Sequence, residues 1–359
     1  MNFKVLACTL PAIILMGCIN DSERTVKDSQ ESLSLTPVLS SAELTEGASI
    51  NGYIAKDGVE LVYGLGVLAS RVDGGDWTIE TSNNFYGFGA EIVDSQHWIF
   101  GVARSASDGA SSARRVVEQT IDAGTTWSSV DVAVDLDAYD FVGGFAYDYN
   151  QDQLFTSVDL GLAVTTLPNL EFEMLSEVSD FPNDSVKLLL NPNRDELWMI
   201  GALGIASGGG SVDTAYVKRF DLSESPIGTD DFSEAVEFST VYGGLIYSND
   251  PDVVLVSGSG GIMRTEDGGA NWRHVLKNRN IHNVVESESG DRIYTAYLEN
   301  EHVKVACSES MGNRWTASTV DTDSAVGVTL IERNGDKLIL GFDRESLHAV
   351  ALSDIPCER

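Results

Sequence analysis

The chain has 359 residues, with 23 basic and 55 acidic side chains and a formal net charge of −32 at pH 7. This charge argues against nucleic-acid binding, which requires a basic surface to neutralise phosphates. It also argues against direct adhesion to anionic lipid. The acidic surface fits a soluble domain that works outside the cytoplasm.

Residues 1–17 are expected to be a signal peptide. Lys4 precedes an apolar run from Val5 to Met16, which is too short to span a bilayer and has the layout of a secretory signal. The run ends Leu15-Met16-Gly17-Cys18, which resembles the bacterial lipoprotein box. That resemblance implies cleavage before Cys18 and lipidation of Cys18. The alternative is an ordinary signal peptide with a chance cysteine.

The residue after Cys18 is Ile19 rather than aspartate. In lipoproteins this implies the outer membrane, with the protein facing the periplasm or the cell surface. Residues 18–34 are rich in serine and acids and lack strand or helix periodicity, so we expect a flexible tether there. Residues 35–359 then form a single folded domain, which we expect to be a monomer that contacts the membrane through its lipid only.

Two cysteines remain after the signal and the lipid site are set aside. Cys307 and Cys357 form an even pair, which in an oxidising compartment indicates a disulfide. The sequence leaves open whether they lie within bonding reach, and two buried free thiols are the alternative.

An internal repeat runs through the domain. Seven segments share a polar turn followed by a short apolar strand that often closes on a small residue, and these small residues lie 37 to 56 positions apart. They are Gly64, Gly101, Thr156, Gly201, Ser257, Thr295 and Gly341. A period of about 46 residues holds four short strands. The pattern predicts an all-β fold, a seven-bladed β-propeller.

A second motif accompanies the repeat. Residues 265–272 and 120–127 fit S/T-x-D-x-G-x-x-W, residues 308–315 fit it with serine in place of aspartate, and residues 71–77 are one residue short. These segments resemble the Asp-box, or BNR, repeat of propeller proteins. The residues assigned to it are Asp73, Gly75, Trp77, Asp122, Gly124, Trp127, Asp267, Gly269, Trp272, Ser310, Gly312 and Trp315.

The Asp-box is interpreted as structural. An aspartate in a turn accepts hydrogen bonds from nearby N–H groups, the glycine supplies a special backbone conformation, and the tryptophan buries its ring. A catalytic aspartate occurs once, whereas this one recurs at the repeat period. The box is expected between the third and fourth strands of a blade, with loops 105–114 and 204–215 on the opposite face.

The last blade lacks a strand, and residues 34–44 are expected to supply it and close the ring. No catalytic residue, metal site or cofactor is predicted. The acidic runs 131–140 and 221–237 are interpreted as solvated loops, and the five histidines are dispersed without ligand spacing.

Asp-box proteins include sialidases, so a sialidase-type glycoside hydrolase is the alternative function. The sequence lacks an Arg-Ile-Pro segment, and Arg71 is the only arginine between residues 30 and 100. A closer resemblance, in size and boxes, is to the single propellers related to photosystem II assembly factors, although their arginine-rich surface is missing. This resemblance implies a non-enzymatic binding or assembly scaffold for protein or glycan partners.

Overall fold

The structure is a computed structural model that describes residues 26–104, 114–131, 142–158, 161–177, 184–191, 193–203, 214–224, 226–322 and 327–357. The expected signal peptide and Cys18 lie outside these residues, as do most of the two loops and nearly all of the acidic run 131–140. In the part described, no helix is long and apolar enough to cross a membrane.

Strands dominate the fold, as the repeat predicted. All seven apolar repeat segments form strands, each paired with the strand that precedes it in the chain. One sheet has six strands: β3 (Ser49–Lys56), β4 (Val59–Val72), β5 (Thr78–Ile92), β6 (Trp98–Arg104), β7 (Arg114–Thr120) and β8 (Ser128–Asp131).

Three further sheets have four strands each, in chain order. They are β9 (Val142–Asp148), β10 (Gln153–Val158), β11 (Gly161–Thr166) and β12 (Glu173–Glu177); β13 (Asp184–Asn191), β14 (Glu196–Leu203), β15 (Thr214–Asp221) and β16 (Gly228–Asp231); and β17 (Val241–Ile246), β18 (Val254–Gly258), β19 (Gly261–Thr265) and β20 (Arg273–Lys277).

The last two sheets include strands from the beginning of the domain. β1 (Lys27–Leu33) joins β21 (Val285–Glu286), β22 (Ile293–Glu299), β23 (His302–Ser308) and β24 (Thr316–Val320), and β2 (Thr36–Leu39) joins β25 (Val328–Asn334), β26 (Lys337–Phe342) and β27 (Ser346–Ala351). Two short 3-10 turns cover Ser41–Glu43 and Leu352–Asp354.

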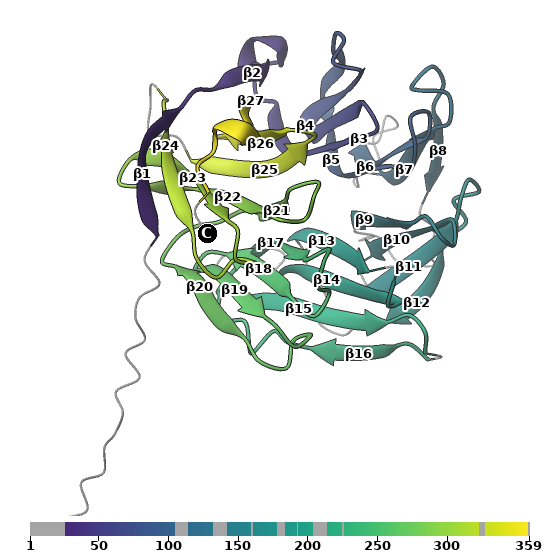
Figure 1. The fold of residues 1–359 in the computed structure, drawn as a ribbon. Helices are drawn as coiled ribbons and strands as arrows, with labels where there is room; N and C mark the ends of the chain where they lie inside the picture. The colour runs from purple at the N-terminus through teal and green to yellow at the C-terminus, as the bar shows by residue number, and fades with distance from the viewer. Residues whose placement is uncertain are drawn as a thin grey trace, which may run out of the picture.

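The sheets stand around a central axis (Figure 1). Their innermost strands contact one another in a closed cycle of β3, β5, β9, β13, β17, β21 and β25. β5 belongs to two units, because its residues 78–81 pair with β4 and its residues 85–92 pair with β6. Hydrogen bonds therefore join a unit of β3, β4 and the first part of β5 to a unit of the second part of β5, β6, β7 and β8. We keep the count of seven blades as a proposal.

The hydrophobic core lies between the faces of neighbouring sheets. One cluster joins Leu255 and Ile262 of β18 and β19 to Ile293 and Trp315 of the next sheet. Because both faces of such a sheet are covered, a central strand such as β18 is buried along its whole length and consists of consecutive apolar or small residues.

The ring closes as predicted. β2 lies within the expected segment 34–44 and pairs with β27, so a strand from the start of the domain completes the sheet made by the last three strands. Pro37 is tolerated there because β2 is an edge strand, in which not every N–H group is needed for pairing.

The predicted tether over residues 18–34 is wrong for its second half. Residues 27–33 form β1, which pairs in parallel with β24, and the Lys27 N–H donates to the Trp315 carbonyl at 3.1 Å. The outer edge of β24 offers unpaired backbone groups. A polar segment can bind them without an alternating apolar pattern, so the composition gave no sign of this strand.

Cys307 in β23 and Cys357 near the end of the chain form a disulfide, with their Cα atoms 5.2 Å apart. Cys307 is fully buried in a cluster shared by the sheets of β22–β24 and β25–β27. The disulfide therefore fixes the last residues of the chain to the sheet that precedes the closing one.

Candidate functional site

The turn at residues 265–272 is held by its own side chains. The carboxylate of Asp267 accepts hydrogen bonds from the Asn271 N–H at 2.8 Å and from the Thr265 hydroxyl at 2.7 Å. The Gly269 N–H donates to the Thr265 hydroxyl at 2.9 Å, and Gly269 has a left-handed φ of 103°. A hydrogen bond from the Asn271 side-chain amide at 2.7 Å, together with the two bonds that Asp267 accepts from the Asn271 N–H and the Thr265 hydroxyl, lowers the pKa of Asp267.

The turn at residues 120–127 repeats the same geometry. Asp122 accepts from the Thr126 N–H at 2.8 Å and from the Thr120 hydroxyl at 2.8 Å, and the pKa of Asp122 is lowered mainly by its bond to the Thr126 side chain. In the turn at 308–315 the Ser310 hydroxyl takes the place of the carboxylate and accepts from the Arg314 N–H at 2.8 Å.

The turn at residues 71–77 is different, and the assignment of Asp73 and Gly75 to an Asp-box is wrong. Asp73 and Gly74 both have left-handed φ angles, 51° and 67°, and the Gly75 N–H donates to the Val72 carbonyl at 3.0 Å. This is a two-residue hairpin turn. Arg71 stands where the other turns have a hydroxyl, and it forms two hydrogen bonds with Glu60 instead.

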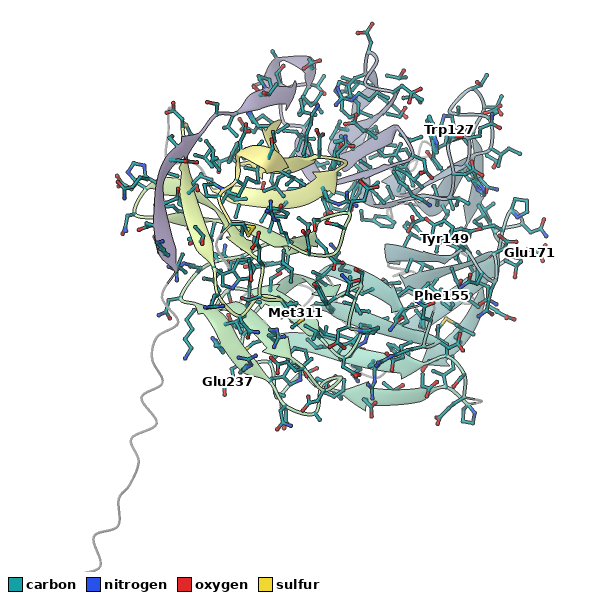
Figure 2. All side chains as sticks on the ribbon, in the orientation of Figure 1. Trp127, Tyr149, Phe155, Glu171, Glu237 and Met311 are labelled. Carbon is teal, nitrogen blue, oxygen red and sulfur yellow. A yellow bond between two sulfur atoms is a disulfide. The ribbon has the colours of Figure 1, made fainter. Side chains whose placement is uncertain are left out.

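The indoles of these turns are not all buried, contrary to the prediction. Trp315 is 3% exposed, and its Nε1–H donates to the Gly312 carbonyl at 2.9 Å. Trp272 packs against Trp198 of the preceding sheet, and Trp77 donates to the Val38 carbonyl of β2. Trp127, however, is 43% exposed because the side chains that face it from β4 and β5 leave a space. It lies beside β6–β8 (Figure 2).

Three of these turns connect the third to the fourth strand of a unit, β7 to β8, β19 to β20 and β23 to β24, and the turn at 71–77 connects β4 to β5. We call the end of the ring where they lie the box face. The carboxylates of Asp122 and Asp267 are occupied by their own turns. A functional site is better sought where side chains from several sheets converge, and the axis is the one place all the innermost strands share.

Six innermost strands contain a β-bulge near their first residues. In β3, β5, β9, β13, β17 and β25 the inner strand has one more residue than the following strand between two successive pairs. A bulge bends its strand and re-aims a side chain, and bulges are frequent next to active sites.

The bulge residues whose side chains are described share one burial pattern. Each is half-buried between two buried neighbours. They are Asn51, Phe88, Gly144, Tyr242 and Thr329. The bulges lie at the strand ends remote from the hairpin to the second strand. In an antiparallel meander that end is opposite the boxes, and we call it the bulge face.

The bulges explain why the repeat closes on a small residue. A Cβ on Gly64 would lie 1.9 Å from the Ser49 carbonyl oxygen, and one on Gly101 would lie 2.5 Å from the Phe88 ring. Where the small residue is threonine, its hydroxyl binds the inner strand. Thr156 donates to the Gly144 carbonyl at 3.0 Å, and Thr295 donates to the Asn283 carbonyl at 2.8 Å.

Aromatic side chains gather at the bulge face. The Tyr242 ring stacks on His282 with ring centroids 4.6 Å apart. The Phe88 ring lies beside the exposed Tyr86 ring, with centroids 6.5 Å apart. Burial, aided by the charge of Arg344, lowers the pKa of His282 to about 4. The imidazole is therefore neutral at physiological pH and offers an aromatic face rather than a charge.

A polar group spans the axis beside these rings. Lys187 of β13 donates to Glu332 of β25 at 3.3 Å, and the Asn283 Nδ2–H donates to the same carboxylate oxygen at 2.9 Å. Asn283 is 6% exposed, and its Oδ1 has no hydrogen-bond partner. An unpaired buried acceptor is costly, so this amide is suited to receive a donor.

We call Phe88, Lys187, Tyr242, Asn283 and Glu332, together with His282, the axial set. It combines aromatic faces with one cation, one carboxylate and one amide. Such a surface can bind a chain that carries both apolar and hydrogen-bonding groups. Within the described residues, no group of three or more histidine, cysteine, aspartate or glutamate side chains is arranged to hold a metal ion.

A cluster of arginines and carboxylates at the central pore would favour a hydrolase, and a pore lined by small and apolar residues would favour a scaffold. The axial set matches neither expectation. A hydrolase of sialidase type predicted converging arginines, whereas the described cation of the set is Lys187, already bonded to Glu332. A scaffold would fit a pore lined by small and apolar residues, whereas the axial set combines aromatic, charged and amide side chains. Glu91, further along β5, has a pKa raised to about 7 by burial.

No protein-family model matches the chain, and no curated protein sequence matches it. Solved structures do. A structure of YCF48 bound to D1 peptide superposes with a TM-score of 0.62 at 12% identity, covering 91% of this chain and 99% of that one. Inactive H270A virginiamycin B lyase from Staphylococcus aureus, with quinupristin, gives a TM-score of 0.56 at 12% identity, with 88% and 98% covered.

The fold is a β-propeller. A third propeller neighbour, the GH74 enzyme of Niastella koreensis, has a TM-score of 0.55 at 12% identity, and the likeness covers 88% of this chain and 53% of the enzyme. At such identities the likeness concerns the fold alone. The neighbours include a peptide-bound protein and an enzyme, so the propeller scaffold by itself is compatible with either hypothesis.

The sequence analysis identified the turns and missed the axial set. A signal was present, since three of the bulge residues are followed directly by glycine: Asn51-Gly52, Phe88-Gly89 and Tyr242-Gly243. An isolated glycine within a strand pattern indicates a bulge. Lys187 and Glu332 gave no such signal, because only the closed ring brings β13 and β25 to the same axis.

Proposed function

We propose that this protein is a lipid-anchored, seven-bladed propeller of the bacterial envelope that acts as a non-enzymatic binding or assembly scaffold. Its partner is a protein or a glycan, and it docks on the bulge face at the axis. The observation that carries the proposal is the ring of bulges, which turns side chains from separate sheets toward one end of the axis.

A protein segment is the better of the two partners for the axial set. Stacked Tyr242 and His282 offer an apolar surface, and the unpaired Asn283 Oδ1 can accept a backbone N–H. Aromatic side chains at the centre of an interface with polar groups around them are typical of protein recognition. The similar structure that holds a peptide supports this choice.

The anchor and the fold together give the scaffold an orientation. β1 runs parallel to β24, and Lys27 pairs beside Trp315, so the chain before residue 26 leaves from the box face. The eight residues between Cys18 and Lys27 reach about 28 Å when fully extended. A lipid on Cys18 would hold the box face toward the outer membrane and leave the bulge face open.

In-cell crosslinking of a C-terminally tagged protein, followed by mass spectrometry, tests this function. The variant Phe88→Ala/Tyr242→Ala removes two axial rings, and Tyr149→Ala, an exposed ring near the box face, is the matched control. We expect the wild type to crosslink to a discrete set of envelope proteins. These crosslinks should be lost in the axial variant and kept in the control. Equal recovery with both variants would refute the axial site.

A glycoside hydrolase is the second candidate, and one observation favours it. The charges of Glu91 and Glu332 both raise the pKa of Tyr63, so the two carboxyl groups lie near one phenol. A carboxyl group with a pKa of about 7 is suited to act as a general acid. Activity on glycoside substrates that disappears in Glu91→Gln and in Glu332→Gln, with folding intact, would establish this function.

A further inference from the structure

The exposed Trp127 lies in a cavity of about 340 Å³ between two units of the six-stranded sheet. The indole and the Phe100 ring, with centroids 5.6 Å apart, form one side of it. The opposite side comes from the outer halves of β4 and β5. This cavity is remote from the bulge face, because Trp127 belongs to a box turn.

The same chain provides three comparisons for this indole. In each of the other three turns the preceding sheet supplies an apolar cover. Trp77 packs with Leu39 and Leu347 of the closing sheet, Trp272 with Trp198 and Phe232, and Trp315 with Leu255. Trp127 is the one of the four that the described structure leaves beside a cavity.

The cavity follows from the side chains that β4 and β5 turn toward Trp127. On that face Leu68 is followed by Ser70, Thr78 and Glu80, which are short or polar. Their neighbour Ile79 packs instead with Trp77 on the other face of the same strands. Because side chains alternate between the two faces of a strand, Ile79 points away from Trp127, and space is left above the Trp127 indole.

The lining of the cavity contains many polar groups, which favours a ligand that has hydrogen-bonding groups of its own. Hydroxyl groups of Ser70, Thr78, Ser128 and Ser129 and carboxylates of Glu80 and Glu118 surround the two rings. A purely aliphatic occupant would offer these groups no hydrogen bonds. A ligand with one flat C–H face and hydroxyl groups around its edge satisfies both the rings and the rim.

We propose that this cavity binds one neutral pyranose unit of a glycan, stacked on Trp127. A hexose ring fits a cavity of this size, and its C–H face packs on an indole while its hydroxyls pair with the serine, threonine and glutamate side chains. An acidic sugar is disfavoured by the net charge of −32. This site is separate from the axial set and does not depend on the proposed function.

The experiment is a titration of the purified mature chain without its lipidated cysteine, residues 19–359, with cellotetraose, xylotetraose, mannotetraose and N-acetylchitotetraose up to about 10 mM, since a single stacked sugar binds weakly. Intrinsic fluorescence and calorimetry report binding. We expect at least one saturable neutral ligand, a more than tenfold loss in Trp127→Ala, and unchanged binding in the control Tyr149→Ala.

A second variant separates loss of the site from loss of the fold. Ser70→Leu keeps the indole and fills the cavity, so we expect lost binding, a blue-shifted Trp127 emission and an unchanged or higher Tm. The absence of saturable binding by the wild type, binding that persists in both Trp127→Ala and Ser70→Leu, or binding only of sialyllactose would each overturn the proposal.

Discussion

Lys187 and Glu332 are 145 positions apart in the chain, yet Lys187 Nζ donates to Glu332 Oε1 at 3.3 Å. Their strands, β13 and β25, are not neighbours in the cycle of innermost strands, so the ion pair bridges the axis instead of joining adjacent sheets. Each side chain is 31% exposed. A pair this open contributes little to stability, which fits a role in shaping the bulge face.

Removal of this pair is expected to affect binding more than folding. Lys187→Met should lower the free energy of unfolding by about 1 kcal/mol or less, whereas crosslinking to the protein partner should fall severalfold. Chemical denaturation and quantitative crosslinking measure the two effects. A large loss of stability with unchanged crosslinking would show that the pair is structural.

The Asp-box carboxylates are expected to stabilise the fold above acidic pH. Hydrogen bonds lower the folded-state pKa of Asp122 and Asp267 below the usual 3.8. Their contribution is therefore present above the unfolded pKa and is lost as pH falls through the folded pKa. Asp267→Asn should lower Tm at pH 7 and converge with the wild type at strongly acidic pH.

The control for that experiment is Asp73→Asn. Asp73 occupies a two-residue turn without box bonds, so its substitution should leave the pH dependence of Tm unchanged. If Asp73→Asn reproduced the effect of Asp267→Asn, general surface charge would explain both.

His282 is expected to make the fold sensitive to mild acid. Its pKa is about 4 in the folded state, against about 6.5 in an unfolded chain. Between these values the unfolded chain binds a proton that the folded chain does not, so stability falls as pH drops from about 6.5 to about 4. His282→Gln should flatten the Tm profile in this window, and an unchanged profile would contradict the assignment.

Reduction of the Cys307–Cys357 disulfide is expected to destabilise the domain. The loop it closes spans 50 positions, for which a loss of about 2–4 kcal/mol is typical. Denaturation with and without a reductant measures the difference, and Cys307→Ala/Cys357→Ala should be insensitive to the reductant. Equal stability of the oxidised and reduced wild type would contradict this prediction.

Cys18→Ala is expected to move the protein from the membrane fraction to the soluble fraction. The reason is that the acidic domain has little affinity for lipid without an acyl anchor. Cell fractionation with immunodetection measures the change. Retention of the variant in the membrane fraction would contradict the lipoprotein proposal and leave the axial site to be judged on its own experiment.

The sequence predicted the elements whose signals are local. The seven apolar segments appeared as strands, because alternation and turn residues act within a few positions. The boxes at 120–127 and 265–272 were readable for the same reason. The turn at 71–77 was assigned to an Asp-box wrongly, because its aspartate and glycine also suit a two-residue hairpin turn. The backbone angles distinguish the hairpin turn from the Asp-box.

By itself the sequence determined the strand class, the repeat and the turn chemistry, since each depends on neighbours along the chain. The tertiary structure alone decided which side chains meet. It placed β1 on an open sheet edge, left Trp127 uncovered, and brought Lys187 and Glu332 together across the axis. Those contacts depend on ring closure, and no pattern along the chain records which edges and faces a closed ring brings together.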